Sequence, residues 1–181
     1  MKSISKRKTN PRQILLEFFL ENPTGNFYES EARKRAGVSL GAANKYLKKL
    51  SRESILLRER KGRMNFYRLN RDLPLIKQLK ITHSLSLPQI SRLRDIGKKL
   101  GLGIYIYGSA ARGEDAEDSD LDILLIGNAK LAEIEKSISE IRKKSKKRIK
   151  LSIFTRVEWA RMKKADPAFY ERVEKDKKEI A

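Results

Sequence analysis

The sequence predicts an α+β protein of two domains: a helical N-terminal domain that ends in a β-hairpin, and a C-terminal domain built on a small sheet. In the first 71 residues, three segments with helical periodicity precede two short runs with the composition of strands. In the remainder, apolar strand-like runs alternate with amphipathic helical segments. Charge divides the chain in the same way, because the net charge is +13 over the first 80 residues and +6 over residues 81–181.

Composition limits the functions that this chain can have. Its 181 residues include 42 Lys and Arg against 23 Asp and Glu, a formal net charge of +19, which indicates a polyanionic partner such as nucleic acid. No cysteine is present, so a disulfide framework and a thiolate metal site are excluded. Because no apolar run is long enough to span a bilayer and the N-terminus lacks an apolar signal core, we expect a cytoplasmic protein without a membrane partner.

The N-terminal domain is predicted to follow a short polar segment. Residues 1–10 are basic and polar, and we expect them to form a disordered tail. Pro11 opens a first helix with one apolar face, which ends before Pro23. A second, short helix over residues 29–36 closes at Gly37.

A third helix and a hairpin complete this domain, which is predicted to span residues 11–71. Ser39 can cap the helix. The inward stripe of the helix is predicted to comprise Leu40, Ala43, Leu47 and Leu50. Two strands, over residues 55–60 and 64–69, are joined by a basic turn over residues 61–63.

Three helices followed by a basic-tipped hairpin resemble a winged helix-turn-helix domain. In such a domain the third helix enters the major groove of double-stranded DNA, and Lys and Arg side chains contact phosphates. Asn44 is the side chain that fits an adenine edge. The DNA-binding residues that this resemblance implies are Ser39, Asn44, Lys45, Lys48, Lys49, Arg60, Lys61 and Arg63. Winged helices also serve dimerisation and protein contact, so that alternative stays open, and a homodimer is expected only by analogy.

A connecting segment over residues 72–87, predicted to be helical, leads into the C-terminal domain, residues 88–181. A helix over residues 88–100 comes first, and a later helix over residues 129–144 is capped by Asn128. The inward side of the later helix is predicted to comprise Leu131, Ile134, Ile138 and Ile141. The predicted strands are residues 102–107, 121–126 and 149–154, and the last two helices open at Thr155 and Asp166.

A Gly-Ser turn and a pair of aspartates form the most informative motif. Gly108-Ser109 ends one predicted strand, and ten residues later Asp120 and Asp122 flank the start of the next. Because alternate residues of a strand share a face, the two carboxylates project together and repel each other unless a cation lies between them. Magnesium prefers oxygen ligands and bridges to phosphates, and the turn offers N–H groups and a hydroxyl to a phosphate. Together these features indicate a nucleoside triphosphate site.

This motif, with its flanking Tyr-Gly-Ser-Ala-Ala-Arg-Gly and Asp-Ser-Asp-Leu-Asp-Ile, resembles the nucleotidyltransferase superfamily that includes DNA polymerase beta, in particular its minimal members. The resemblance implies a small mixed sheet, and transfer of a nucleoside monophosphate from an NTP to an acceptor hydroxyl. It implies that Gly108 and Ser109 hold the triphosphate. Asp120 and Asp122 would be the catalytic, metal-binding carboxylates, and Arg112, expected in the following loop, would contact a phosphate. The implied cofactor is Mg²⁺, with ATP as the expected substrate.

The sequence departs from the family at the third carboxylate, which the family carries on the following strand. In this chain that strand places Lys150 and Ser152 on the side that faces the site. The departure counts against two-metal catalysis, because a charged lysine neither coordinates a metal nor acts as a base. Glu158 belongs to a predicted capping box. The remaining acids near the motif, Glu114, Asp115 and Asp118, are expected to be solvated loop residues.

Three functions remain open from the sequence. The first is a nucleotidyltransferase with its own DNA-binding module, acting on a nucleic-acid or protein acceptor. The minimal family includes antitoxins that adenylylate a partner toxin, so a toxin is one such protein acceptor. The second is a DNA-binding transcription regulator whose C-terminal domain binds a nucleotide or is catalytically inactive. The third, less favoured, is an RNA-modifying enzyme whose basic domain holds RNA.

Overall fold

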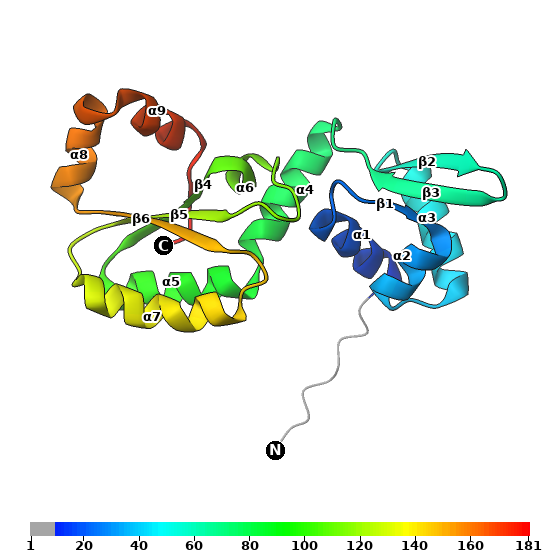
Figure 1. Ribbon diagram of the computed structural model, residues 1–181, viewed down its shortest axis with the longest axis horizontal. Helices are drawn as coiled ribbons and strands as arrows, with labels where there is room; N and C mark the ends of the chain where they lie inside the picture. The colour runs from blue at the N-terminus through cyan, green and yellow to red at the C-terminus, as the bar shows by residue number, and fades with distance from the viewer. Residues whose placement is uncertain (1–9) are drawn as a thin grey trace, which may run out of the picture. The chain divides into compact units, whose positions relative to one another are not determined.

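The computed structural model describes residues 10–181, which form two compact units (Figure 1). The N-terminal unit extends to Ile76 and the C-terminal unit spans Lys77–Ala181. The boundary between them falls within α4 (Pro74–Leu85). The predicted disordered tail lies outside the described residues except for Asn10. That residue instead caps α1, because its side chain accepts a 3.0 Å hydrogen bond from the backbone N–H of Arg12.

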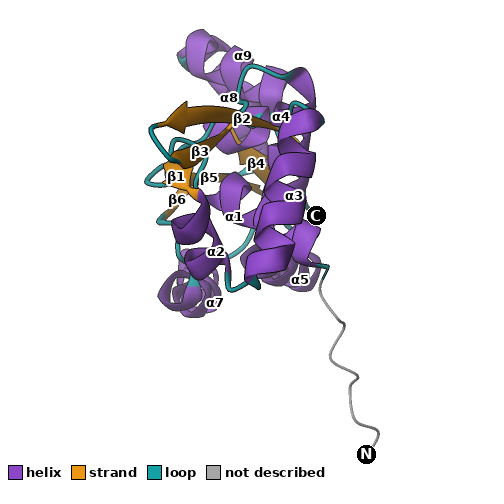
Figure 2. Cartoon of the chain, turned by 90° about the vertical axis from the view of Figure 1, so that its right-hand side faces the viewer, coloured by secondary structure: helices purple, strands orange, loops and turns teal. Residues whose placement is uncertain are grey.

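The N-terminal unit contains three helices and a three-stranded antiparallel sheet (Figure 2). The helices are α1 (Pro11–Glu21), α2 (Glu29–Ala36) and α3 (Leu40–Arg52). The strands β1 (Asn26–Tyr28), β2 (Leu56–Lys61) and β3 (Met64–Leu69) lie in the order β1-β3-β2. Gly37 ends α2 with a φ of 69°, and the Ser39 hydroxyl caps α3. The sequence did not predict β1, because three residues are too few to show an alternating pattern.

The core of this unit comes from the inward faces of the helices and from the sheet. Its fully buried residues include Leu15, Phe19, Ala43, Leu47, Leu50 and Tyr67. The predicted stripe of α3 is therefore correct from Ala43 onward. Leu40 was placed in that stripe but is 64% exposed, because it is the first residue of α3 and precedes the packed turns.

The C-terminal unit is built on a mixed four-stranded sheet in the order β6-β5-β4-β7. Its strands are β4 (Gly103–Tyr107), β5 (Leu121–Ile126), β6 (Ile149–Phe154) and β7 (Lys178–Glu179). The β5 and β6 strands run parallel, whereas the other neighbours are antiparallel. After α4 the helices are α5 (Pro88–Leu100), α6 (Gly108–Arg112), α7 (Leu131–Lys144), α8 (Arg156–Ala165) and α9 (Pro167–Asp176).

Four details of this unit differ from the sequence prediction. The α6 helix follows β4 directly, where only a turn was expected. The α7 helix begins at Leu131 and is capped by Lys130 without a side-chain hydrogen bond, so Asn128 is not the cap. As a first-turn residue, Leu131 is 62% exposed, whereas Ile134, Ile138 and Ile141 are buried as predicted. The two-residue β7 carried no strand signal.

Helices cover both faces of the sheet (Figure 1). The α5 and α7 helices pack on one face, where Ile104, Ile123 and Ile138 belong to the larger core cluster. The α8 and α9 helices supply Trp159 and Val173 to a second cluster on the other face. A strand covered on both faces reads as a continuous apolar run, which explains the Leu-Asp-Ile-Leu-Leu-Ile sequence of β5 and leaves its aspartate conspicuous. Within the described residues, no helix combines the length and apolar character needed to cross a membrane.

Candidate active site

The predicted catalytic aspartates lie at the start of the central strand β5. Leu121 and Ile123 are buried in the core, so the alternating residues Asp120 and Asp122 lie on the opposite face. The strand register places Asp122 between Tyr107 of β4 and Lys150 of β6. Directly paired residues of neighbouring strands share a face. One row across the sheet therefore holds an aromatic ring, a carboxylate and an ammonium group.

The backbone of Gly108 lies directly against the carboxylate of Asp122. Gly108 has a φ of 72°, and a Cβ atom at this position would lie 2.5 Å from Oδ2 of Asp122. Any side chain would thus be disfavoured twice, by the left-handed backbone conformation and by a steric clash. Ser109 follows in the first turn of α6 and is partly exposed. The Gly-Ser motif and the Asp-x-Asp motif, which are separate in the sequence, therefore meet in the fold.

Asp120 forms a bidentate ion pair that the sequence interpretation did not include. Arg148 Nε donates to Oδ1 of Asp120 at 2.8 Å, and Nη2 donates to Oδ2 at 2.7 Å. These hydrogen bonds, helped by the charge of Lys150, hold the pKa of Asp120 below its ordinary value. The alternation that places Lys150 and Ser152 on this face extends back to residue 148, so a signal for Arg148 was present in the sequence.

The pKa of Asp122 is shifted in the opposite direction from that of Asp120. Asp122 is partly buried, and this burial raises the pKa of its carboxyl above the ordinary value, to which the charge of Asp120 adds. Lys150, Arg112 and Arg172 act against this rise but do not cancel it. Asp122 is thus a carboxylate whose charge is incompletely compensated within the described residues.

The sequence analysis expected Arg112 in a loop, but the residue lies on α6. Its Nε donates to Glu114 at 2.9 Å and its Nη1 donates to Asp176 of α9 at 3.0 Å. Both hydrogen bonds raise the pKa of Arg112. The Arg112 side chain therefore links α6 to α9. Its Nη2 group takes part in neither of these two hydrogen bonds.

The prediction of solvated loop acids was wrong for Asp115. This residue is 5% exposed, and its carboxylate pairs with Lys147 and, at 3.0 Å, with Lys80 of α4. Burial acts to raise the pKa of Asp115, but the two lysines outweigh burial and lower it. Glu114 is paired with Lys77 and Arg112, and Asp118 is exposed. Ion pairs of Glu114 and Asp115 thus hold the loop between α6 and β5 in place.

The donor set fits one magnesium ion better than two. The described residues contain no cluster of three or more His, Cys, Asp or Glu side chains suited to a metal. Ser152 on the site-facing side of β6 lies 2.9 Å from the Tyr107 hydroxyl, and Glu158 closes the capping box of α8, so neither offers a third carboxylate. Magnesium is commonly held by one or two carboxylates together with substrate phosphates. Asp120 and Asp122 meet that requirement if Arg148 gives up its pairing.

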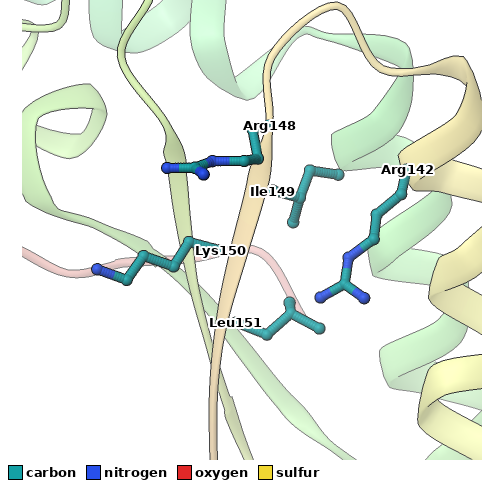
Figure 3. Close-up of a pocket in the computed structure, with 5 residues that line it drawn as sticks. All are labelled: Arg142, Arg148, Ile149, Lys150 and Leu151. Carbon is teal, nitrogen blue, oxygen red and sulfur yellow. The ribbon is translucent and has the colours of Figure 1, made fainter.

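A pocket of about 310 Å³ lies beside this site, along β6 (Figure 3). Its lining residues are Arg142, Arg148, Ile149, Lys150 and Leu151. Figure 3 shows the side chains of Arg148 and Lys150 on one side of β6, and Arg142 reaching toward the strand on the other side from α7. Because β6 is an edge strand of this sheet, the pocket opens along a free strand edge.

The predicted DNA-binding residues all lie in the N-terminal unit. On α3, Lys48 is partly buried, whereas Ser39, Asn44, Lys45 and Lys49 are exposed. The Ser39 hydroxyl accepts the capping hydrogen bond from Ala42. On the β2–β3 hairpin, Arg60, Lys61 and Arg63 are exposed. The helix and the hairpin thus each present several cations to solvent.

The site thus combines a mixed sheet, a helix opened by Gly108, and an aspartate pair at the start of the adjacent strand. Residues 89–179, half of the chain, match the family model described as "Nucleotidyltransferase domain", and the chain belongs to this family. No curated protein matches the chain. A 1.40 Å crystal structure of a candidate nucleotidyltransferase from Sulfolobus solfataricus aligns with a TM-score of 0.32 and 19% sequence identity, over 55% of this chain and 85% of that chain.

Proposed function

We propose that the C-terminal unit transfers a nucleoside monophosphate from an NTP, with ATP as the expected donor, to a hydroxyl group of a nucleic acid or protein. The observation that carries this proposal is the approach of Gly108 to Asp122, with Asp120 beside it. In the reaction, the acceptor oxygen forms a bond to the α-phosphorus, and the bond from that phosphorus to the bridging oxygen breaks. Pyrophosphate leaves, and the hydroxyl proton is released to solvent.

Each residue has a role that follows from its position. The absence of a side chain at Gly108 lets a phosphate approach the backbone, and Ser109 offers a hydroxyl and an N–H group. Arg112 keeps its Nη2 donors for a phosphate while it remains paired. Asp120 and Asp122 would hold magnesium, which when bound with the triphosphate supplies positive charge against the developing negative charge.

A label-transfer experiment tests this proposal. The full-length protein would be incubated with Mg²⁺, each α-labelled NTP in turn, and a lysate of the source cell. We expect label on a protein or nucleic-acid band, and we expect Asp122→Asn to reduce it by two or more orders of magnitude, about 3 kcal/mol. Asp118→Asn, an exposed loop acid outside the site, is the matched control. Equal labelling by both variants would refute the assignment.

A second function is favoured by the exposed cations of the N-terminal unit. We infer that this unit is a winged helix-turn-helix that binds double-stranded DNA through α3 and the β2–β3 hairpin. Its charge supports this role, as does the set of exposed lysines on α3. If the C-terminal unit is inactive, the chain is a DNA-binding regulator, and the missing third carboxylate favours that alternative.

A measurement of duplex binding tests the second function. The affinity for duplex DNA, measured by fluorescence anisotropy, should fall steeply with salt and should weaken in Lys45→Gln, Lys49→Gln protein. Asp120→Asn should leave the DNA affinity unchanged, because this carboxylate belongs to the other unit. Affinity that is insensitive to the lysine substitutions would exclude α3 as the contact helix.

A further inference from the structure

A second concentration of positive charge lies in the C-terminal unit, at the end of α7 and the start of β6. Seven of the nine residues from 142 to 150 are Lys or Arg, and none is acidic. Lys147 turns inward to Asp115. The other six are exposed and are called the basic strip here: Arg142, Lys143, Lys144, Lys146, Arg148 and Lys150.

The basic strip is continuous with the candidate active site. Arg148 contacts Asp120 directly, and Lys150 pairs in register with Asp122 on the neighbouring strand. Three cations of the strip, Arg142, Arg148 and Lys150, line the pocket along β6, and Arg142 lies on the other side of the strand from the other two (Figure 3). Cations near a helix C-terminus interact favourably with its dipole, which accounts for Lys143 and Lys144 on α7. The dipole does not account for Arg148, just before β6, and Lys150, on β6, which lie beside the two candidate carboxylates.

Three cations of the strip, Arg142, Lys143 and Arg148, pair with acidic side chains through exposed contacts that a ligand can replace. Arg142 pairs with Glu135 at 3.0 Å and Lys143 with Glu140 at 3.3 Å, and both pairs are exposed. The Arg148 side chain is 81% exposed while it contacts Asp120. Exposed ion pairs of this kind contribute little to stability, whereas arginine binds phosphate through bidentate, charge-assisted hydrogen bonds. A ligand that carries a row of phosphates can therefore displace the acidic partners.

We propose that the basic strip binds the phosphodiester backbone of a single nucleic-acid strand and brings its terminal hydroxyl to Asp120 and Asp122. The cations run from the end of α7 to the start of the edge strand β6, beside the pocket. Positively charged grooves of this kind track one backbone, so we expect a single strand to bind better than a duplex. Binding of a phosphate to Arg148 would also free Asp120 from its ion pair, which couples acceptor binding to the carboxylates. The acceptor role rests on the proposed transferase activity, but the binding site does not.

The test uses the full-length chain and labelled single strands of RNA and of DNA, with anisotropy as the readout at several salt concentrations. The strip variant is Lys143→Gln, Lys144→Gln, Lys146→Gln. Its matched control, Arg161→Gln, Lys163→Gln, Lys164→Gln, removes the same charge from exposed positions of α8. We expect the strip variant to lose about tenfold or more in single-strand affinity. Its salt dependence should fall by about 2 in slope, at roughly 0.7 for each lost contact.

Several outcomes would overturn the proposal. Equal losses in both variants would show general charge attraction, and no loss in the strip variant would exclude the strip. Competition by polyglutamate as effective as that by RNA at matched charge would assign the strip to acidic proteins. The N-terminal contribution is measured with Lys45→Gln, Lys48→Gln, Lys49→Gln protein, which should lose duplex affinity more than single-strand affinity.

Label transfer to the bound strand separates this inference from the proposed function. Strip-dependent binding without transfer supports the strip and counts against the transferase. Transfer to another acceptor without strip-dependent binding overturns the strip and leaves the transferase in place.

Discussion

The two ends of the loop between α6 and β5 hold aspartates in contrasting ways. Near its start, Asp115 is buried and pairs with Lys80 of α4 and with Lys147. At its end, Asp120 pairs with the exposed Arg148. Burial makes the first arrangement costly to break, whereas the second can exchange with solvent or ligand. The loop is therefore anchored at one end by a buried network, while its other end keeps a partner that a ligand can displace.

Removal of the buried carboxylate of Asp115 should have the largest effect on stability. We expect Asp115→Asn to lower the free energy of unfolding of the C-terminal unit by about 3–5 kcal/mol, because it removes the buried carboxylate that pairs with both Lys80 and Lys147. Denaturant titration can follow this unit alone, since Trp159 is the single tryptophan and lies within it.

Asp118→Asn provides the control for that substitution. This acid lies in the same loop but is exposed, so its replacement should change the unfolding free energy by less than about 0.5 kcal/mol. Similar losses for Asp115→Asn and Asp118→Asn would show that the Lys80–Asp115–Lys147 network does not anchor the loop.

The backbone of Gly113 also holds the start of this loop against α4. Gly113 has a φ of 69°, and a Cβ atom there would lie 2.2 Å from the carbonyl oxygen of Lys77. Gly113→Ala should therefore add about 1 kcal/mol of conformational strain and about 1–3 kcal/mol from the clash with a backbone that cannot easily move. The readout is again the unfolding transition of Trp159.

Gly101→Ala separates the cost of backbone strain from the cost of the steric clash expected in Gly113→Ala. Gly101 has a similar φ of 63°, but its Cβ would meet nothing within 4 Å, so about 1 kcal/mol is expected from strain alone. If the two alanine variants unfold together, the close approach between the loop and α4 has no energetic consequence.

The sequence predicted that Asp120 and Asp122 lie on one face, and it predicted most of the helices and strands around them. Strand alternation and residue spacing are local signals, and these properties depend on them. The sequence did not predict the burial of Asp115, since the partners Lys80 and Lys147 are far away along the chain and are brought together only by packing. Arg148 lies between these cases. Strand alternation predicts that Arg148 lies on the same face as Lys150 and Ser152. Its pairing with Asp120, however, depends on the parallel register of β5 and β6.

The smallest effect concerns the proton affinity of Asp120, which is partly buried beside the exposed Arg148. Arg148→Gln should raise the pKa of Asp120 toward its ordinary value, because the bidentate hydrogen bonds are the main cause of its lowering. The carboxyl resonances of Asp120 and Asp122 can be followed by ¹³C NMR during an acid titration. Arg142→Gln, which removes a cation from the same pocket but pairs with Glu135, should leave the titration of Asp120 unchanged.

The direction of the pH effect distinguishes the two site aspartates. The pKa of Asp120 is lowered by folding, so its pairing stabilises the fold above the unfolded-state pKa of about 3.9, and this contribution disappears as the pH falls through the lowered value. The pKa of Asp122 is raised by burial, so its ionised form opposes folding and its protonation relieves that cost. In the wild-type chain Asp122 should therefore take up its proton at a higher pH than Asp120. The reverse order would mean that the Arg148 pair does not persist in solution, and Asp120 would then be free for a metal without any displacement.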